Sequence, residues 1–124
     1  MKIIHTKDVM HVEKPEGVNV AYYLFPEYEV HVDEQLPHTT QTWHYHASIW
    51  ESVYIVDGEL TAQWKEDGKI KKETVQTGDL IESEHTLHTY SNDTDKITKY
   101  IVIKQVLTGG NKSQLLKTDR VVGQ

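Results

Sequence analysis

The sequence contains no cysteine among its 124 residues. Disulfide bridges, thiolate metal sites and cysteine nucleophiles are therefore excluded. Basic side chains are also in the minority, because 13 Lys and Arg stand against 19 Asp and Glu, which gives a formal charge of -6. Phosphate binding requires a basic surface, so we expect no nucleic-acid partner.

Long apolar runs are missing as well. No stretch approaches the roughly 18 apolar residues that a membrane-spanning helix needs, and residues 1–5 lack the apolar core of a signal peptide. We therefore expect a cytoplasmic protein without a membrane partner. Hydrophobic residues nevertheless make up 37% of the chain, and a chain of this length corresponds to one domain. The sequence predicts a single folded domain over residues 1–124.

No window shows a sustained helical period, whereas short strand-like segments recur between turn signals. The expected strands are 18–25, 27–32, 39–46, 51–56, 59–65, 69–75, 80–82, 87–92 and 97–106. The dipeptides Asp57-Gly58 and Asp67-Gly68 are typical of hairpin turns. This pattern predicts an all-β antiparallel sandwich or barrel. At most one helical turn is expected, at 113–117, in a loosely ordered tail that begins at about residue 109.

Histidine is abundant, with eight residues of this type in the chain. His44 and His46 stand two apart on an expected strand, so both imidazoles point to the same face. Glu51 follows after a short turn at 47–49 and can return to the same region, and His88 comes from a later strand. A His-x-His pair alone is often coincidental on a strand, so its surroundings decide the interpretation.

Those surroundings resemble the two motifs of the cupin superfamily over residues 38–92. His44-Tyr-His46, then Glu51 and, after six intervening residues, Gly58 resemble the first motif. Gly78-Asp79 followed by His88 and Asn92 resembles the second. Three positions depart from the pattern. His38 stands where a glycine usually opens the first motif. Glu84-His85-Thr86 replaces the usual Pro-x-Gly, and the spacing from Gly78 to His88 is one residue short. The last two departures make His85 a rival of His88 as the fourth ligand.

The resemblance implies a single-domain cupin β-barrel, a jelly roll of two antiparallel sheets. It also implies one divalent transition metal, bound by His44, His46, Glu51 and His88. A site of three imidazoles and one carboxylate favours Fe, Mn or Ni, while Zn or Cu could also bind. The expected partner is a small-molecule substrate, and the expected activity is that of a metal-dependent dioxygenase or of an isomerase or lyase. The alternative is a non-catalytic module that binds or senses a small molecule.

Other side chains near the motifs are candidates for the same site. Tyr90 shares a strand face with His88 and is the candidate proton donor. The candidate pocket residues are Trp50, Gln63, His38 and His85. The strand at 97–106 is apolar on both faces, which indicates burial on both. One face would line the barrel, and the other predicts a homodimer interface.

Overall fold

The computed structural model describes residues 1–106 and 120–123. Within these residues the chain forms strands and one short 3-10 helix, η1 (Thr6–Asp8), and no helix is long and apolar enough to cross a membrane. The strands are β1 (Met10–Lys14), β2 (Val18–Leu24), β3 (Tyr28–Gln35), β4 (Thr39–Thr40), β5 (His44–His46), β6 (Ile49–Asp57), β7 (Glu59–Glu66), β8 (Lys69–Gln76), β9 (Leu80–Glu82), β10 (His88–Asn92), β11 (Thr98–Val106) and β12 (Arg120–Val122).

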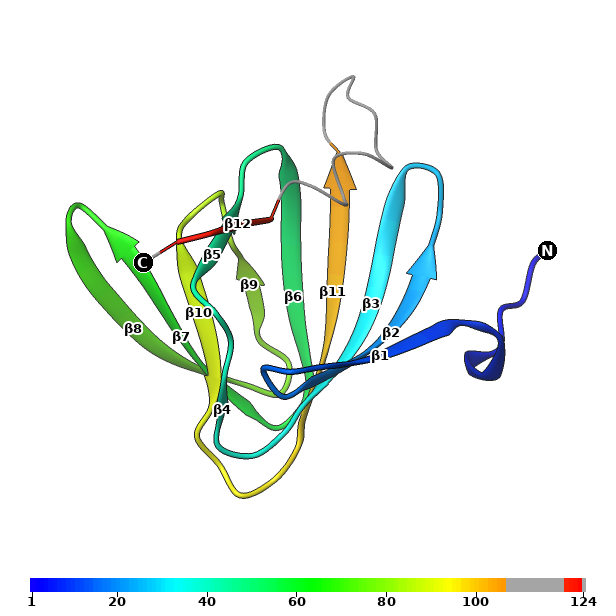
Figure 1. Ribbon diagram of the computed structural model, residues 1–124, viewed down its shortest axis with the longest axis horizontal. Helices are drawn as coiled ribbons and strands as arrows, with labels where there is room; N and C mark the ends of the chain where they lie inside the picture. The colour runs from blue at the N-terminus through cyan, green and yellow to red at the C-terminus, as the bar shows by residue number, and fades with distance from the viewer. Residues whose placement is uncertain (107–119, 124) are drawn as a thin grey trace.

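The strands form two antiparallel sheets. Sheet A has the order β1-β2-β3-β11-β6-β9, and sheet B has the order β12-β5-β10-β7-β8 with β4 paired to β10. Figure 1 shows the two sheets leaning together into a barrel, with the N-terminal segment extending away from it. The expected all-β fold of two antiparallel sheets, the cupin jelly roll, is confirmed.

The two Asp-Gly turns make different connections: one joins neighbouring strands of one sheet, and the other joins the two sheets. Asp67 and Gly68 both have positive φ and join β7 to β8, so this hairpin is confirmed. The prediction of a hairpin at Asp57-Gly58 is wrong, because β6 lies in sheet A and β7 in sheet B. Gly58, with a φ of 109°, turns the chain from one sheet to the other beside Thr98. A Cβ at residue 58 would stand only 2.8 Å from the Thr98 hydroxyl oxygen.

Several strand bounds differ from those expected. The strand predicted at 39–46 is interrupted and forms β4 and β5. Strand β1 was not predicted, and neither was β12, whose Arg120 pairs with His46 on β5. The loosely ordered tail predicted from about residue 109 lies largely outside the described residues, and 120–122 within it form β12. The helical turn predicted at 113–117 lies outside the described residues.

The barrel interior has an apolar part and a polar part. The apolar core lies between β6, β7, β8, β10 and β11, and its buried members are Val53, Ile55, Leu60, Ala62, Val75, Tyr90, Tyr100 and Val102. Strand β3 reverses the usual pattern, since its inner face carries buried His31, Asp33 and Gln35 while the Val32 side chain is exposed. A polar inner face has to satisfy its hydrogen bonds inside the barrel.

A buried hydrogen-bond network joins the two sheets in this polar part. The Tyr100 hydroxyl donates to Gln35 Oε1 at 2.9 Å, and the Gln41 amide donates to the Tyr100 oxygen at 2.7 Å. The Gln35 amide in turn donates to the Tyr90 carbonyl on sheet B at 3.1 Å. This network fixes sheet A against sheet B beside the candidate site.

Candidate metal centre

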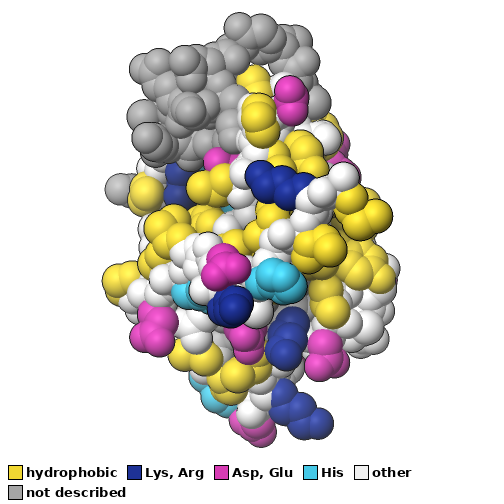
Figure 2. Space-filling model, turned by 90° about the vertical axis from the view of Figure 1, so that its right-hand side faces the viewer, with side chains coloured by type: hydrophobic (Ala, Val, Ile, Leu, Met, Phe, Trp, Pro, Cys, Tyr) yellow, Lys and Arg dark blue, Asp and Glu magenta, His cyan; other side chains and the backbone are white. Residues whose placement is uncertain are grey.

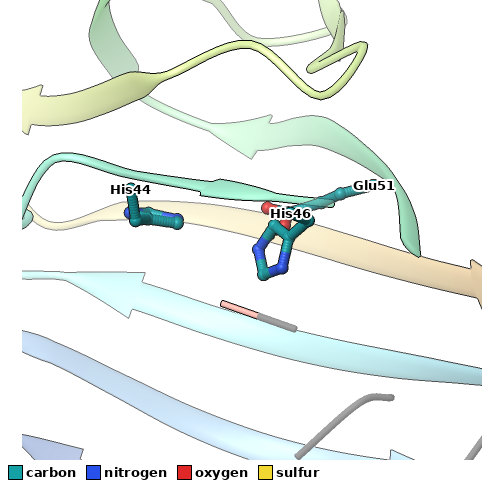
Figure 3. Close-up of side chains that lie close together, drawn as sticks. All are labelled: His44, His46 and Glu51. Carbon is teal, nitrogen blue, oxygen red and sulfur yellow. Dashed lines mark ion pairs between the residues drawn. The ribbon is translucent and has the colours of Figure 1, made fainter. Parts of the chain in front are cut away.

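Two histidines and a glutamate converge where the chain passes from sheet B to sheet A. His44 and His46 lie on β5 in sheet B, and Glu51 lies on β6 in sheet A. All three are buried, and one potential ligand atom from each lies within 4.8 Å of the others. Figure 3 shows the His46 ring next to the Glu51 carboxylate, with His44 further along the same strand. Imidazole nitrogens and a carboxylate at such separations fit a divalent metal ion.

His46 and Glu51 are both buried, and His46 Nε2 lies 2.6 Å from Glu51 Oε2, within hydrogen-bond distance. Burial alone would raise the pKa of the Glu51 carboxyl. The hydrogen bond from His46 and the positive charge of Lys104 outweigh burial, so the pKa of Glu51 is lowered and the group is a carboxylate at neutral pH. An ionised carboxylate is the state that a metal ligand needs.

His44 and His88 face each other across sheet B as an antiparallel pair, with ring centroids 4.6 Å apart. The Nδ1 atom of each ring lies within 2.7 Å of the main-chain carbonyl two residues earlier, which belongs to Thr42 for His44 and to Thr86 for His88. With Nδ1 donating to these carbonyls, Nε2 is left as the coordinating nitrogen of each ring. Burial lowers the pKa of His44 to about 3 and also lowers the pKa of His88, so both rings are neutral at pH 7.

His88 does not belong to the group of three whose ligand atoms lie within 4.8 Å. It does adjoin that group, and its Nε2 is buried without a hydrogen-bond partner in the described part of the chain. Buried polar atoms are rarely left without a partner unless something else binds there. The role of His88 as the fourth ligand stays a prediction that this placement supports.

A strained turn holds the main chain of the ligand-bearing segment. Glu84 and His85 both have positive φ, at 50° and 60°, and form the centre of a turn that begins at Ser83. The Ser83 hydroxyl donates to the Glu51 carbonyl at 3.1 Å, and His85 Nδ1 lies 2.7 Å from the His46 carbonyl. His85, the rival ligand, is exposed, and its ring contacts the main chain of the segment that carries His46 and Glu51. The turn therefore fixes the main chain that carries His46 and Glu51.

A cavity of about 40 Å³ opens beside the three candidate ligands. Its polar lining includes Asp33 on β3 and Lys104 on β11, neither of which was predicted as a site residue. Lys104 stands directly opposite Glu51 in the pairing of β11 with β6. Alternation on β11 places Lys104 on the same face as Tyr100 and Val102, and this was the signal that could have found it. Burial raises the pKa of Asp33 to about 7.

A second cavity, of about 320 Å³, lies on the side of β7, β8 and β9. Gln63, a predicted pocket residue, lines it together with His88 and Tyr90. Tyr90 lines both cavities and is only 2% exposed, and its hydroxyl has no hydrogen-bond partner among the described residues. Burial and the charge of Glu51 raise the pKa of Tyr90, so its hydroxyl keeps its proton.

The other three predicted pocket residues, Trp50, His38 and His85, line neither of these cavities. Trp50 points to the outer side of β6, where its indole nitrogen donates to Glu82. His38, with a φ of 57°, lies in an exposed turn and pairs with Asp95 at 2.7 Å. His38 precedes β4, whereas His44 lies on β5, so the two residues do not share one continuous strand.

The family is established by comparison of the sequence. The model of the cupin domain family matches residues 28–104, which is more than half of the chain. The protein therefore belongs to the cupin family, as the two motifs indicated. No curated protein matches the chain significantly.

Solved structures with this fold include enzymes of several kinds. The capsular polysaccharide assembling protein CapF from Staphylococcus aureus is 16% identical with a TM-score of 0.73, over 92% of this chain and 34% of that one. A cupin sugar phosphate isomerase from Silicibacter pomeroyi is 15% identical with a TM-score of 0.67, over 84% and 75%. An oxalate decarboxylase variant from Bacillus subtilis is 14% identical with a TM-score of 0.72, over 89% and 30%. The chain thus spans about a third of CapF and of the decarboxylase, and these likenesses show the fold alone.

Proposed function

We propose that this cupin is a metal-dependent enzyme acting on a small organic substrate, with His44, His46, Glu51 and His88 as the metal ligands. One observation carries the proposal: two imidazoles and a carboxylate, all buried, meet at the edge of an open cavity. A divalent ion bound there supplies a Lewis acid with coordination positions to spare for a substrate. Fe, Mn or Ni would suit this donor set best.

Tyr90 is the residue that we propose to move a proton. Its hydroxyl stays protonated, faces the cavity that the candidate ligands line, and has no partner among the described residues. A phenol in this position can hold a proton next to a substrate oxygen or carbon. This favours isomerase or lyase chemistry on a sugar or organic acid. Dioxygenation is the second reaction type that the same ligands would serve.

Metal content and turnover test the proposal. Purified protein should contain close to one divalent ion per chain on elemental analysis, and His46→Ala should lose it while keeping the far-UV circular dichroism of the barrel. His5→Ala, at an exposed histidine outside the barrel, is the matched control and should keep its metal. A wild-type protein that binds no metal after incubation with Fe(II), Mn(II) or Ni(II) would refute the proposal.

The reaction type can be separated by a second measurement. Turnover of sugar acids without oxygen would indicate isomerase or lyase chemistry, and oxygen uptake with substrate would indicate dioxygenation. Tyr90→Phe should abolish anaerobic turnover while the metal content stays unchanged. An unaltered rate in that variant would remove Tyr90 from the mechanism.

The second candidate function is a non-catalytic module that captures a small molecule. The second cavity favours it, because about 320 Å³ lies within the range of small-ligand pockets and Gln63 and Trp64 line it with the apolar side chains of Ala62 and Val75. Saturable binding of a small molecule by the metal-loaded protein, with no turnover of it, would support this function.

We also propose that two copies associate through the outer face of sheet A. A row of paired apolar side chains crosses the sheet from β2 to β9: Ala21, Val32, Ile101, Tyr54 and Leu80. Leu80 is 58% exposed and Tyr54 is 43% exposed. Figure 2 views the right-hand side of Figure 1, where hydrophobic side chains are interspersed with charged ones. Contiguous apolar surface favours association. A light-scattering mass of one chain at micromolar concentration would contradict the dimer.

A further inference from the structure

The cavity beside the candidate metal ligands holds cationic side chains that the proposed function leaves without a role. Lys14 on β1, Lys104 on β11 and Arg120 on β12 all line it. Lys104 is the direct cross-strand neighbour of Glu51 on the inner face of sheet A. Paired residues of this kind have Cβ atoms about 5 Å apart. A cation thus stands next to a ligand of the candidate metal.

Two of these cations act electrostatically on carboxylates of the cavity, Lys104 on Glu51 and both lysines on Asp33, without forming an ion pair with either. Arg120 pairs with Glu16 at 3.2 Å. In contrast, neither Lys14 nor Lys104 makes an ion pair with any residue that the structure describes. The pKa of Lys14 is lowered, first by its burial and then by the positive charges of Lys104 and Arg120. Such crowding of like charges costs stability unless an anion joins the cations.

Two further side chains in the same cavity have polar atoms without a partner. Asp33 is 7% exposed and Tyr90 is 2% exposed. Among the described residues, Asp33 Oδ1 and the Tyr90 hydroxyl make no hydrogen bond. Buried polar atoms are rarely left unpaired unless water or a ligand completes them. These two unpartnered atoms point to a polar ligand in this cavity.

We propose that Lys14 and Lys104 form a subsite for the carboxylate of a small organic acid, with Tyr90 and Asp33 facing the same ligand. The subsite rests on the proposed function, because it names the substrate class for that metal centre. A cavity of 40 Å³ holds about three or four waters, which suits a small anion such as a short-chain carboxylate. The second cavity is lined by Glu66, Glu73, Glu82 and Glu84 and by no Lys or Arg, so an anion would select the first.

Glycolate is the probe for this subsite, and glycolamide is its neutral control. Binding to metal-free protein and to zinc-loaded protein can be followed by the shift of backbone amide signals in ¹⁵N–¹H spectra. We expect Lys104→Gln and Lys14→Gln each to weaken glycolate binding about tenfold or more, because each removes a charge-assisted hydrogen bond. Lys104→Arg should retain most of the affinity. Glycolamide should bind weakly, and equally, in all variants.

Lys99→Gln is the matched control, since Lys99 lies on the outer face of the same strand and is exposed. It should bind glycolate as the wild type does. Inorganic phosphate should bind more weakly than glycolate, and tighter phosphate binding would overturn the carboxylate assignment. Should Lys104→Gln not fold, Lys14→Gln on the edge strand β1 decides the question.

The outcomes separate the subsite from the metal centre. Equal glycolate affinity in the wild type and both lysine variants would overturn the subsite, even in a protein that binds zinc. Lysine-dependent glycolate binding in a protein that takes up no divalent ion would support the subsite and refute the proposed function. Glycolate binding that depends on zinc and not on the lysines would support the metal centre and overturn the lysine subsite.

Discussion

Replacing Asp33 by Asn should change how the stability of the metal-free protein depends on pH. Asp33 lies on the inner face of β3, is 7% exposed, and has a carboxyl oxygen without a partner among the described residues. Burial raises its pKa from the ordinary 3.8 to about 7, and Lys14 and Lys104 only partly oppose this. The folded protein therefore holds the proton of Asp33 more tightly than the unfolded chain does.

The sign of the effect follows from this difference. An acid whose pKa is raised by folding contributes no penalty below about pH 4, and its penalty grows as the pH rises toward 7. The full difference between the two pKa values corresponds to about 4 kcal/mol. Between pH 5.5 and pH 8 the penalty should grow by about 2 kcal/mol. Asp33→Asn removes this growth, because the amide does not titrate.

Urea unfolding followed by tryptophan fluorescence, in the presence of a chelator, measures the free energy of unfolding at both pH values. The measured quantity is the free energy of unfolding of Asp33→Asn minus that of the wild type. This difference should be about 2 kcal/mol more positive at pH 8 than at pH 5.5. A constant effect of the asparagine cancels in this comparison. Asp57→Asn, at an exposed position on β6, is the control and should show the same difference at both pH values. A pH-independent difference for Asp33→Asn would refute the assignment of a buried, largely un-ionised carboxyl.

Three further predictions concern the ligands and one turn. The folded pKa of His44 is about 3 against 6.5 for the ordinary group. The neutral imidazole therefore destabilises the fold increasingly as the pH falls below 6.5, because the unfolded chain takes up a proton that folded His44 does not. Between pH 7.5 and pH 5, the free energy of unfolding of the metal-free wild type should fall by about 2 kcal/mol more than that of His44→Gln, as measured by urea unfolding. A divalent ion at 100 times its dissociation constant should raise the melting temperature of the wild type by about 10 °C, from about 2.7 kcal/mol of binding free energy. It should leave that of His46→Ala unchanged in the same thermal scan. Gly58→Ala should destabilise the protein by about 2–3 kcal/mol, because its Cβ would meet Thr98 at positive φ. Gly68→Ala, with open space around the position, should cost about 1 kcal/mol, and equal losses would contradict the close approach.

The strand pattern and the first motif were readable from the sequence because both depend on local order. Alternation alone placed His44 and His46 on one face, and the structure buries both beside Glu51. Turn chemistry also identified Asp67-Gly68 correctly. It failed at Asp57-Gly58, since a positive φ reverses the chain and does not determine which strand becomes the neighbour.

The rest of the site depends on contacts between distant strands. Alternation shows that Lys104 and Val102 share a face, but it does not say which face of the strand is the inner one. On β3 the usual rule is reversed, because Asp33 is inside while Val32 is partly exposed. Strand β12 has only three residues, and its position is fixed by pairing with β5 rather than by its own propensity.

The candidate ligands come from both sheets, with His44 and His46 on sheet B and Glu51 on sheet A. An ion held by all three would cross-link the two layers at the point where the chain passes between them. Amide hydrogens on β5 and β6 would then exchange with solvent only through openings that also release the ion. The rate of metal dissociation would report how often the barrel opens. Local opening would be more frequent in the metal-free protein than in the metal-loaded one.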